Sequence, residues 1–318
     1  MRILFCSEAF PAARQLLQER LPADEVCACP AEAVLAAVRE ADVVIPTMTR
    51  IDARVMDAGR FRLIQQWGVG LEGVDLAAAR ARGIWVANVP SEQSGNAASV
   101  AEHALLLILA LLRRFPETQE NIRRGVLGAP LGLALEGRTV CLVGLGGVGR
   151  ALARRLQPFG VRLLGVGRRA LPAAEREALC VALGLAHYYP VAALHTALAE
   201  ADIVVLCVPL TDETRGLIDA AALACMRPSA YLINVARGPL IDYTALREAL
   251  AMGRLAGVGL DVFWTEPIPP DDPLLQYPVI ATPHVAGVTD RAYAGIAAAV
   301  AANVERLRRG QPPLHRVV

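Results

Sequence analysis

One stretch, Arg138–Gly167, limits what this chain can fold into more than any other. An apolar run typical of a β-strand, Thr139–Val143, leads directly into the glycine turn Gly144–Gly149, which reads Gly-Leu-Gly-Gly-Val-Gly. Helix-forming residues follow, and then a second apolar run, Val161–Val166. Strand, Gly-x-Gly-x-x-Gly, helix and strand in this order form the phosphate-binding fingerprint of dinucleotide-binding folds.

Each glycine of this turn has a distinct expected role. Gly144 permits the tight turn, Gly146 lets the backbone approach a pyrophosphate, and Gly149 lets the helix pack close to the strand. The helix N-terminus offers unpaired N–H groups and the positive end of its dipole to the phosphates. The alternative is a glycine-rich turn in another kind of α/β protein, but the flanking strands and helix favour a dinucleotide.

Composition narrows the class of protein further. At one domain per about 150 residues, 318 residues predict two domains. A net charge of +1 gives no general field to attract nucleic acid or a membrane, and the longest apolar run, Ala104–Leu112, is shorter than the ~20 residues that span a bilayer. The seven cysteines match no zinc spacing, so we predict no metal and a reducing, cytoplasmic compartment.

Strand and helix patterns alternate along the chain, which predicts parallel sheets with helices on their faces. Ser99–Arg114 reads as a long helix, apolar nearly all round, that links two such units, and the amphipathic helix Arg291–Arg308 returns to the first. We expect strands at Arg2–Cys6, Val43–Pro46, Leu63–Trp67, Ile84–Val86, Arg138–Val143, Val161–Val166, Ala186–Tyr189, Ile203–Val208, Ala230–Asn234, Gly257–Val262 and Val279–Ala281, and early helices at Ala12–Arg20, Ala31–Ala41 and Leu76–Arg82.

Three residues able to do chemistry follow expected strands of the second unit: Arg237, Glu266 and His284. Ligands of open α/β sheets bind at the carboxyl ends of the strands. An arginine offers a fork of donors to a carboxylate, and a histidine can protonate a carbonyl oxygen as hydride arrives. A glutamate beside that histidine would orient the imidazole and favour its protonated form. A histidine by itself is more often a satisfied loop residue, and the arginine and glutamate more often form a surface ion pair, but their shared placement favours a site for reducing a keto acid.

Motifs spread over nearly the whole chain resemble those of the D-isomer-specific 2-hydroxyacid dehydrogenase family. The glycine turn is one of them. The others are Gly68-Val69-Gly70, Ser99-Val100-Ala101-Glu102, Val208-Pro209-Leu210-Thr211, Asn234-Val235-Ala236-Arg237-Gly238, Gly259-Leu260-Asp261-Val262 with Glu266-Pro267, and Thr282-Pro283-His284. The resemblance implies a Rossmann NAD(P)-binding domain, residues 99–288, inserted in a flavodoxin-like substrate domain, residues 1–98 and 289–318.

The resemblance also implies a function and its residues. The expected reaction interconverts a small 2-keto acid and its D-2-hydroxy acid in the cleft between the domains, with His284 as acid/base and Glu266 as its partner. Arg237, with the N–H groups of Val69 and Gly70, would hold the substrate carboxylate. The expected cofactor contacts are Gly144, Gly146, Gly147, Val148, Gly149, Arg168, Arg169, Val208, Pro209, Thr214, Val235, Ala236, Asp261, His284 and Gly287. A homodimer with Ser99–Arg114 in its interface is expected too.

Some readings stay open at this stage. Trp67 and Trp264 either wall the substrate pocket or simply pack, and Glu72 stands where many family members carry aspartate. Glu266, where formate dehydrogenases of this superfamily carry glutamine, disfavours formate. We predict a glyoxylate/hydroxypyruvate reductase. The alternatives are an enzyme resembling phosphoglycerate dehydrogenase and, from another class, a non-catalytic corepressor-like sensor of NAD(P), although no regulatory tail is apparent.

Cofactor choice depends on the end of the strand Val161–Val166. NAD enzymes of this fold carry an acid there that accepts hydrogen bonds from the ribose 2′-OH. Here Gly167 stands in or next to that place, and Arg168 and Arg169 follow. A glycine leaves room for a 2′-phosphate and the arginines could pair with it, so we predict that NADP is preferred and NAD is possible; the alternative is two solvated arginines and an indifferent site.

Overall fold

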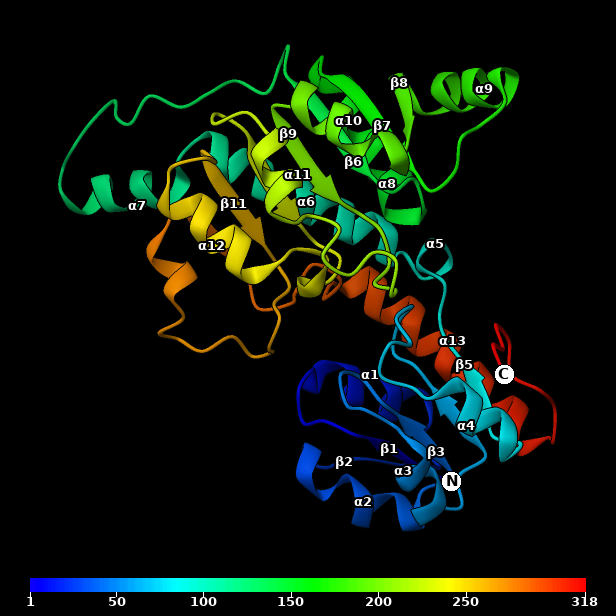
Figure 1. Ribbon diagram of the computed structural model, residues 1–318. Coiled ribbons are helices and arrows are strands. Elements are labelled where there is room, and N and C mark those ends of the chain that lie inside the picture. The colour runs from blue at the N-terminus through cyan, green and yellow to red at the C-terminus, as the bar shows by residue number, and fades with distance from the viewer. The chain divides into compact units, whose positions relative to one another are not determined.

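The computed structural model describes residues 1–318, which form two compact units, residues 1–96 with 288–318 and residues 97–287. Each unit has one entirely parallel β-sheet with helices on its faces (Figure 1). The predicted fold class, two doubly wound parallel sheets, is confirmed.

The first unit is built on a five-stranded sheet of order β2-β1-β3-β4-β5, the flavodoxin-like order. Its strands are β1 (Arg2–Phe5), β2 (Glu25–Ala28), β3 (Val43–Ile45), β4 (Leu63–Gln65) and β5 (Trp85–Ala87). Its helices are α1 (Pro11–Arg20), α2 (Val34–Ala37), α3 (Ala53–Ala58), α4 (Leu76–Ala81), α5 (Ser91–Ser94) and α13 (Asp290–Arg308).

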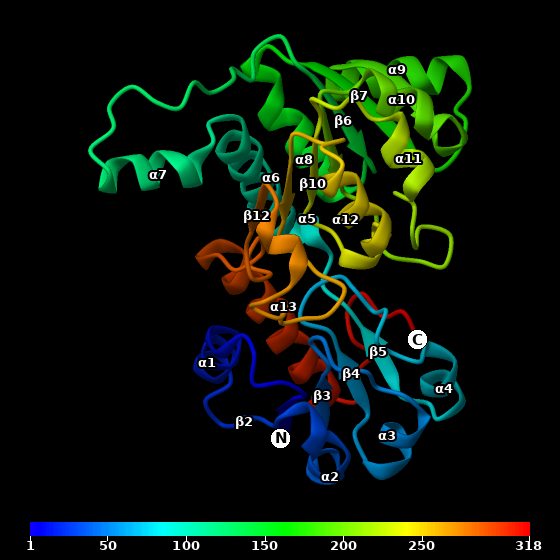
Figure 2. The same cartoon turned by 60° about the vertical axis from the view of Figure 1, so that its left-hand side comes forward.

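Side chains of β1 alternate between two cores, as the period of a strand requires. Ile3 and Phe5 pack with α1 and α13 on one face of the sheet, and Leu4 packs with α2, α3 and α4 on the other. Helix α13 therefore returns to the first unit, as its amphipathic pattern predicted, and lies along α1 (Figure 2).

The second unit carries a seven-stranded sheet of order β12-β11-β10-β9-β6-β7-β8. Its strands are β6 (Thr139–Val143), β7 (Arg162–Gly167), β8 (Leu185–Pro190), β9 (Ile203–Leu206), β10 (Tyr231–Asn234), β11 (Gly257–Leu260) and β12 (Val279–Ala281). Its helices are α6 (Asn96–Leu112), α7 (Phe115–Arg123), α8 (Gly147–Leu156), α9 (Ala173–Leu183), α10 (Leu194–Glu200), α11 (Ala220–Cys225) and α12 (Tyr243–Ala251). Strand order reverses between β6 and β9, which makes their carboxyl ends the topological switch point where such folds bind ligands.

The first unit differs from the sequence-based expectation at β2 and α2, and its helices α3 and α5 were not predicted. Strand β2 was not predicted, because this edge strand is short, half-exposed and without a long apolar run. The expected helix Ala31–Ala41 is instead a single α-turn, α2, between two 3₁₀ turns, Ala31–Ala33 and Val38–Glu40.

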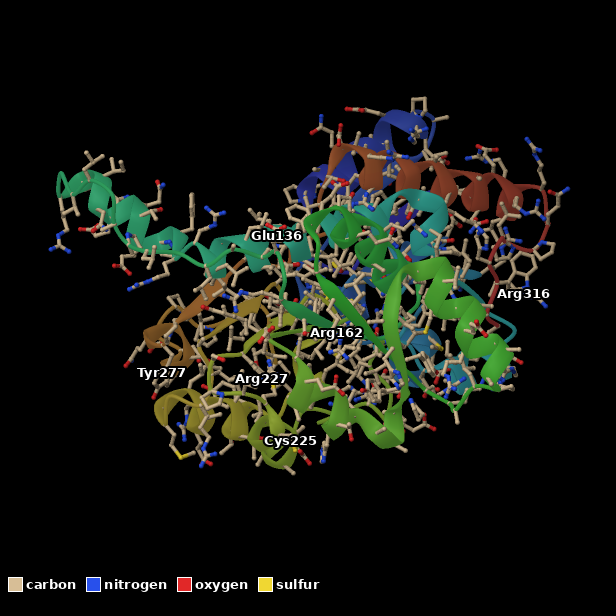
Figure 3. The ribbon with its side chains drawn as sticks, turned by 90° about the horizontal axis from the view of Figure 1, so that it is seen from above. Glu136, Arg162, Cys225, Arg227, Tyr277 and Arg316 are labelled. Carbon is tan, nitrogen blue, oxygen red and sulfur yellow. The ribbon has the colours of Figure 1, made fainter.

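Helix α6 is less completely covered than its all-round apolar sequence predicted. Most of its residues are buried in the second unit, yet Leu106 is 56% exposed. After α6, residues 115–130 stand away from the sheet and carry α7 (Figure 3), and the chain returns to the core at Leu135. No single helix is long and apolar enough to cross a membrane; only α6 and α7 taken together, bent by 58°, pass that test.

Candidate active site

The glycine turn lies at the switch point, between β6 and α8. Gly144 has a φ of +103°, and a Cβ there would lie 2.8 Å from the carbonyl carbon of Cys207 and from Cγ1 of Val208. Gly149 also allows close packing, since its Cβ would lie 3.0 Å from the carbonyl carbon of Gly144. Gly146, the N-cap of α8, has open space where its Cβ would be. These features form a cradle that would admit a pyrophosphate against the helix N-terminus.

The neighbouring loop after β9 closes onto the same turn. Thr214 fixes its shape, because its hydroxyl donates to the carbonyl of Pro209 (2.7 Å) and accepts from the N–H of Thr211 (2.8 Å). Val208 is half-buried and Pro209 is exposed at its start. Val208, one of the expected cofactor contacts, therefore lies beside the glycine turn, and Pro209 follows it in the loop.

Glu266 and His284 form the central pair of the site. His284 Nδ1 lies 2.6 Å from Glu266 Oε2, and the other carboxylate oxygen accepts the N–H of Phe263 at 2.9 Å. Burial alone would raise the pKa of Glu266, but the hydrogen bond and charge of His284, followed by the Phe263 N–H and the charge of Arg237, outweigh it, so that pKa is lowered. The carboxylate stays ionised beside the imidazole and holds Nδ1, which leaves Nε2 as the nitrogen for proton exchange.

Arg237 lies near this pair, on a turn after β10 that packs tightly against the loop after β11. The buried Asn234 side chain donates to the carbonyl of Arg237 (2.8 Å) and accepts the N–H of Ala236 (3.0 Å), which fixes the chain after β10. A Cβ on Gly238 would lie 2.6 Å from the N of Trp264, so only glycine lets the loops after β10 and β11 meet. The guanidinium donates to the carbonyl of Ala236 at 2.7 Å and adds positive charge near Glu266.

Asp261 stabilises the loop that carries His284 through hydrogen bonds to its backbone. His284 has a φ of +54°, a left-handed conformation that costs a non-glycine residue roughly 1–2 kcal/mol. Asp261, only 1% exposed, accepts the N–H of Val285 and of Ala286, both at 2.9 Å, and its own carbonyl accepts the N–H of His284 at 2.9 Å. These bonds stabilise the unusual backbone at the histidine.

Two members of this network had no role assigned from the sequence, although Thr282 belongs to the motif Thr282-Pro283-His284. The Thr282 hydroxyl donates to Asp261 at 2.6 Å, and His103 Nε2 on α6 lies 2.9 Å from the same hydroxyl. His103 is 179 residues away in sequence from Thr282. Its position directly after the Ser99–Glu102 motif was the only available signal.

The loop Gly68–Gly70 of the first unit turns its carbonyls inward. The carbonyls of Gly68, Val69 and Gly70 accept hydrogen bonds from the Val89 N–H, the Asn88 side chain and the Gln66 side chain, respectively. A trans peptide points its C=O and N–H in opposite directions. The N–H groups of Val69 and Gly70 therefore point away from these internal partners.

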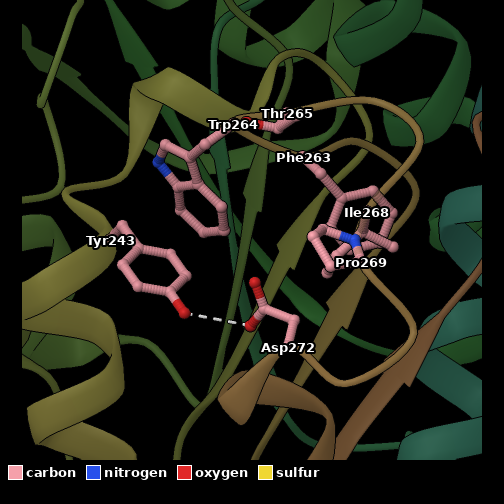
Figure 4. Close-up of a pocket in the computed structure, with 7 residues that line it drawn as sticks. All are labelled: Tyr243, Phe263, Trp264, Thr265, Ile268, Pro269 and Asp272. Atoms are coloured by element: carbon pink, nitrogen blue, oxygen red, sulfur yellow. Dashed lines mark hydrogen bonds between the residues drawn. The ribbon is translucent and has the colours of Figure 1, made fainter.

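Both tryptophans left open by the sequence pack against neighbours. Trp264 donates to the carbonyl of Ile241 (2.7 Å) and meets Tyr243 edge-on at 5.1 Å. The two rings, with Asp272, border a small pocket of about 230 Å³ on this loop (Figure 4). Trp67 lies between Phe5 and Tyr293, and its Nε1 is buried without a hydrogen-bond partner.

Similarity to known proteins agrees with this arrangement. Residues 105–286 match the family described as D-isomer specific 2-hydroxyacid dehydrogenase, NAD binding domain. A glyoxylate reductase of Pyrococcus furiosus is 37% identical over 295 residues, 89% of this chain and 84% of that protein. The chain belongs to the D-isomer-specific 2-hydroxyacid dehydrogenase family. It is a D-2-hydroxyacid dehydrogenase that uses a nicotinamide cofactor.

Solved structures of the family share the whole fold. An NADPH-dependent glyoxylate/hydroxypyruvate reductase from Sinorhizobium meliloti, solved with NADP and malonate, is 33% identical with a TM-score of 0.84 over 100% of this chain and 96% of that one. D-lactate dehydrogenase from Escherichia coli, in its apo form, is 26% identical with a TM-score of 0.83 over all of both chains.

Proposed function

We propose that this dehydrogenase reduces glyoxylate or hydroxypyruvate, with His284 as the proton donor and NADPH as the preferred cofactor. The observation that carries the proposal is the 2.6 Å pair of His284 and Glu266 near the charge of Arg237, on the same sheet as the glycine cradle. The relatives named as glyoxylate reductases support the substrate class.

The chemistry divides between the cofactor and three side chains. A bound nicotinamide supplies the hydride. His284 donates a proton from Nε2 to the substrate's carbonyl oxygen, because Glu266 holds Nδ1. Arg237 binds the carboxylate through its fork of N–H groups. We also propose that the N–H groups of Val69 and Gly70, which point away from the loop's internal partners, bind the substrate carboxylate.

The cofactor contacts follow from the same cradle. Gly144, Gly146, Gly147, Val148 and Gly149 would hold the pyrophosphate, while Val208, Pro209, Thr214, Val235, Ala236, Asp261 and Gly287 would border the riboses and the nicotinamide. Arg168 and Arg169, both exposed at the end of β7, would bind a 2′-phosphate. Their exposure and the absence of an acid at position 167 support the NADPH preference.

A substrate and cofactor panel tests this function. Glyoxylate, hydroxypyruvate, pyruvate, phenylpyruvate and 3-phosphohydroxypyruvate would each be assayed with NADPH and with NADH, and the product's configuration determined. We expect the highest kcat/KM for glyoxylate or hydroxypyruvate with NADPH, and a D product from hydroxypyruvate. A preference for 3-phosphohydroxypyruvate would transfer the assignment to the phosphoglycerate reaction. Cofactor binding without turnover of any keto acid would favour a sensing role.

We further propose a cytoplasmic homodimer. All seven cysteines are free thiols, as in a reducing compartment. Large apolar side chains are exposed along α6 and the segment after it: Leu106, Phe115, Ile122, Leu127 and Leu131. Leu127 and Leu131 are 98% and 91% exposed, which a second copy of the chain would cover. Light scattering should give a dimer mass, and Leu127→Asp with Leu131→Asp should give a monomer; a monomeric wild type would contradict the proposal.

A further inference from the structure

At the end of β7, the ring of Tyr188 fills the space where an acidic side chain would begin. Tyr188 lies on β8, which pairs with β7 in parallel, and it is only 5% exposed. A Cβ on Gly167 would lie 2.8 Å from Cε2 and 2.9 Å from Cζ of this ring. No real Cβ comes that close, so an aspartate or glutamate at position 167 requires the ring to move.

The Tyr188 hydroxyl also fixes the turn that carries the two arginines. It donates to the carbonyl of Arg169 at 2.6 Å. The Arg169 side chain is 77% exposed and lies only 3.6 Å from Glu175, a long surface ion pair that constrains it little. Burial raises the pKa of Tyr188, while the charge of Arg169 opposes that rise, consistent with a guanidinium close to the ring. Among these contacts, the hydroxyl bond is the short one, and it is partly buried.

We propose that Tyr188 is a specificity-determining residue for the cofactor. It excludes an acid from position 167 through its ring and positions the Arg168–Arg169 turn for a 2′-phosphate through its hydroxyl. This inference rests on the proposed use of NADPH, which the arginines would recognise. A tyrosine that only packs would affect both cofactors equally.

The hydroxyl is tested with adenine nucleotides that differ only in the 2′-phosphate. Affinities for 2′,5′-ADP and 5′-AMP are measured by calorimetry for wild type, Tyr188→Phe and Tyr189→Phe. Tyr189 is the matched control, because its hydroxyl bonds Glu200 rather than the arginine turn. We expect Tyr188→Phe to lower the affinity for 2′,5′-ADP relative to that for 5′-AMP about two- to tenfold, the effect of one lost hydrogen bond. In Tyr189→Phe this relative affinity should stay at the wild-type value.

The outcomes separate the two proposals. A wild type that binds 2′,5′-ADP more tightly than 5′-AMP, with the whole difference retained in Tyr188→Phe, overturns the role of the hydroxyl and leaves the NADPH proposal intact. A wild type without any difference overturns both. An equal loss of affinity for both nucleotides in Tyr188→Phe would show that Tyr188 only packs and does not select the cofactor.

The ring is tested by introducing the missing acid. Gly167→Asp alone should lower Tm and weaken binding of both NADH and NADPH, since the new Cβ meets the ring. In Gly167→Asp/Tyr188→Ala the ring is gone, so NADH affinity should recover beyond the sum of the two single effects. Tight NADH binding by Gly167→Asp alone, at wild-type Tm, would show that the ring excludes nothing. If the double variant does not fold, the result with Tyr188→Phe still decides the role of the hydroxyl.

Discussion

Along the carboxyl edge of the seven-stranded sheet, the loops after β10, β11 and β12 differ from the loop after β7 in how far their charged side chains are covered. After β10, β11 and β12, the charged groups are largely covered and paired with one another: the side chains of His284 and Glu266 are 27% and 16% exposed and lie 2.6 Å apart. After β7, Arg168 and Arg169 are exposed, and only the bond from Tyr188 anchors their turn closely.

This difference fits the role proposed for each end of this edge. Proton transfer requires donor and acceptor within a hydrogen-bond length, so the histidine is fixed by Glu266 and, through its backbone, by Asp261. A 2′-phosphate carries its own strong charge, so arginines with exposed side chains can select it once Tyr188 holds the backbone of their turn. Exposed charges are also screened by salt. Substitutions should therefore act on rate at the first end and on cofactor choice at the second.

The largest expected effect is that of His284→Ala, which removes the proposed proton donor. Turnover should fall about 10²–10⁴-fold, the usual contribution of general acid/base catalysis. Cofactor affinity should persist, because the glycine turn is untouched. Steady-state kinetics and cofactor titration measure the two quantities. Near-normal turnover in the variant would remove His284 from the role.

Arg237→Lys should have the next largest effect at the same end. The lysine keeps the charge but loses the planar fork that orients a carboxylate. We expect kcat/KM for 2-keto acids to fall about a hundredfold, since small displacements of a reacting group cost that much. Wild-type kinetics in this variant would mean that the carboxylate binds elsewhere and that the arginine mainly supports the Glu266 loop.

Arg168→Asp addresses the exposed end of the sheet. Losing charged hydrogen bonds of ~1.5–3 kcal/mol should reduce kcat/KM with NADPH roughly ten- to a hundredfold, with much less change for NADH. In the wild type, raising the salt concentration should increase KM for NADPH more than for NADH. Equal efficiency of the wild type with both cofactors would show that the arginines do not reach the phosphate.

Local sequence patterns could be recognised in advance, whereas contacts between residues far apart in the sequence could not. Buried parallel strands are continuous apolar runs, so the strands at Thr139–Val143 and Ile203–Leu206 were recognised, and the motifs placed Arg237, Glu266 and His284 after their strands. The support around them was not predictable: Asn234 and His103 act through hydrogen bonds whose partners no local pattern identifies. Tyr188 was missed for the same reason, because its contact with Gly167 crosses between strands.

In the first unit, the sequence carries a local signal for a helix that was not predicted. Helix α3 was not predicted, although Asp52 directly before it accepts the N–H groups of Arg54 and Val55, as an N-cap residue does. Strand β2 had no comparable signal. Its pairing with β1 depends on the sheet already being present, since Glu25–Ala28 is half-exposed and short.

Glu266→Gln should have the smallest effect, and it acts through pH. The glutamine can still accept a bond from His284 Nδ1, but it carries no charge. The pKa of Glu266 is lowered in the folded protein, which gives the effect on stability its sign. An ionised group favoured by the folded state stabilises it above the unfolded pKa and loses that contribution as pH falls through the folded one. Thermal unfolding between neutral and acidic pH should therefore show a weaker acid destabilisation in Glu266→Gln than in the wild type. Unchanged acid sensitivity would mean that ionisation of Glu266 does not stabilise the folded protein, and the largely covered end of the sheet would lose the charged pair that sets it apart from the exposed end.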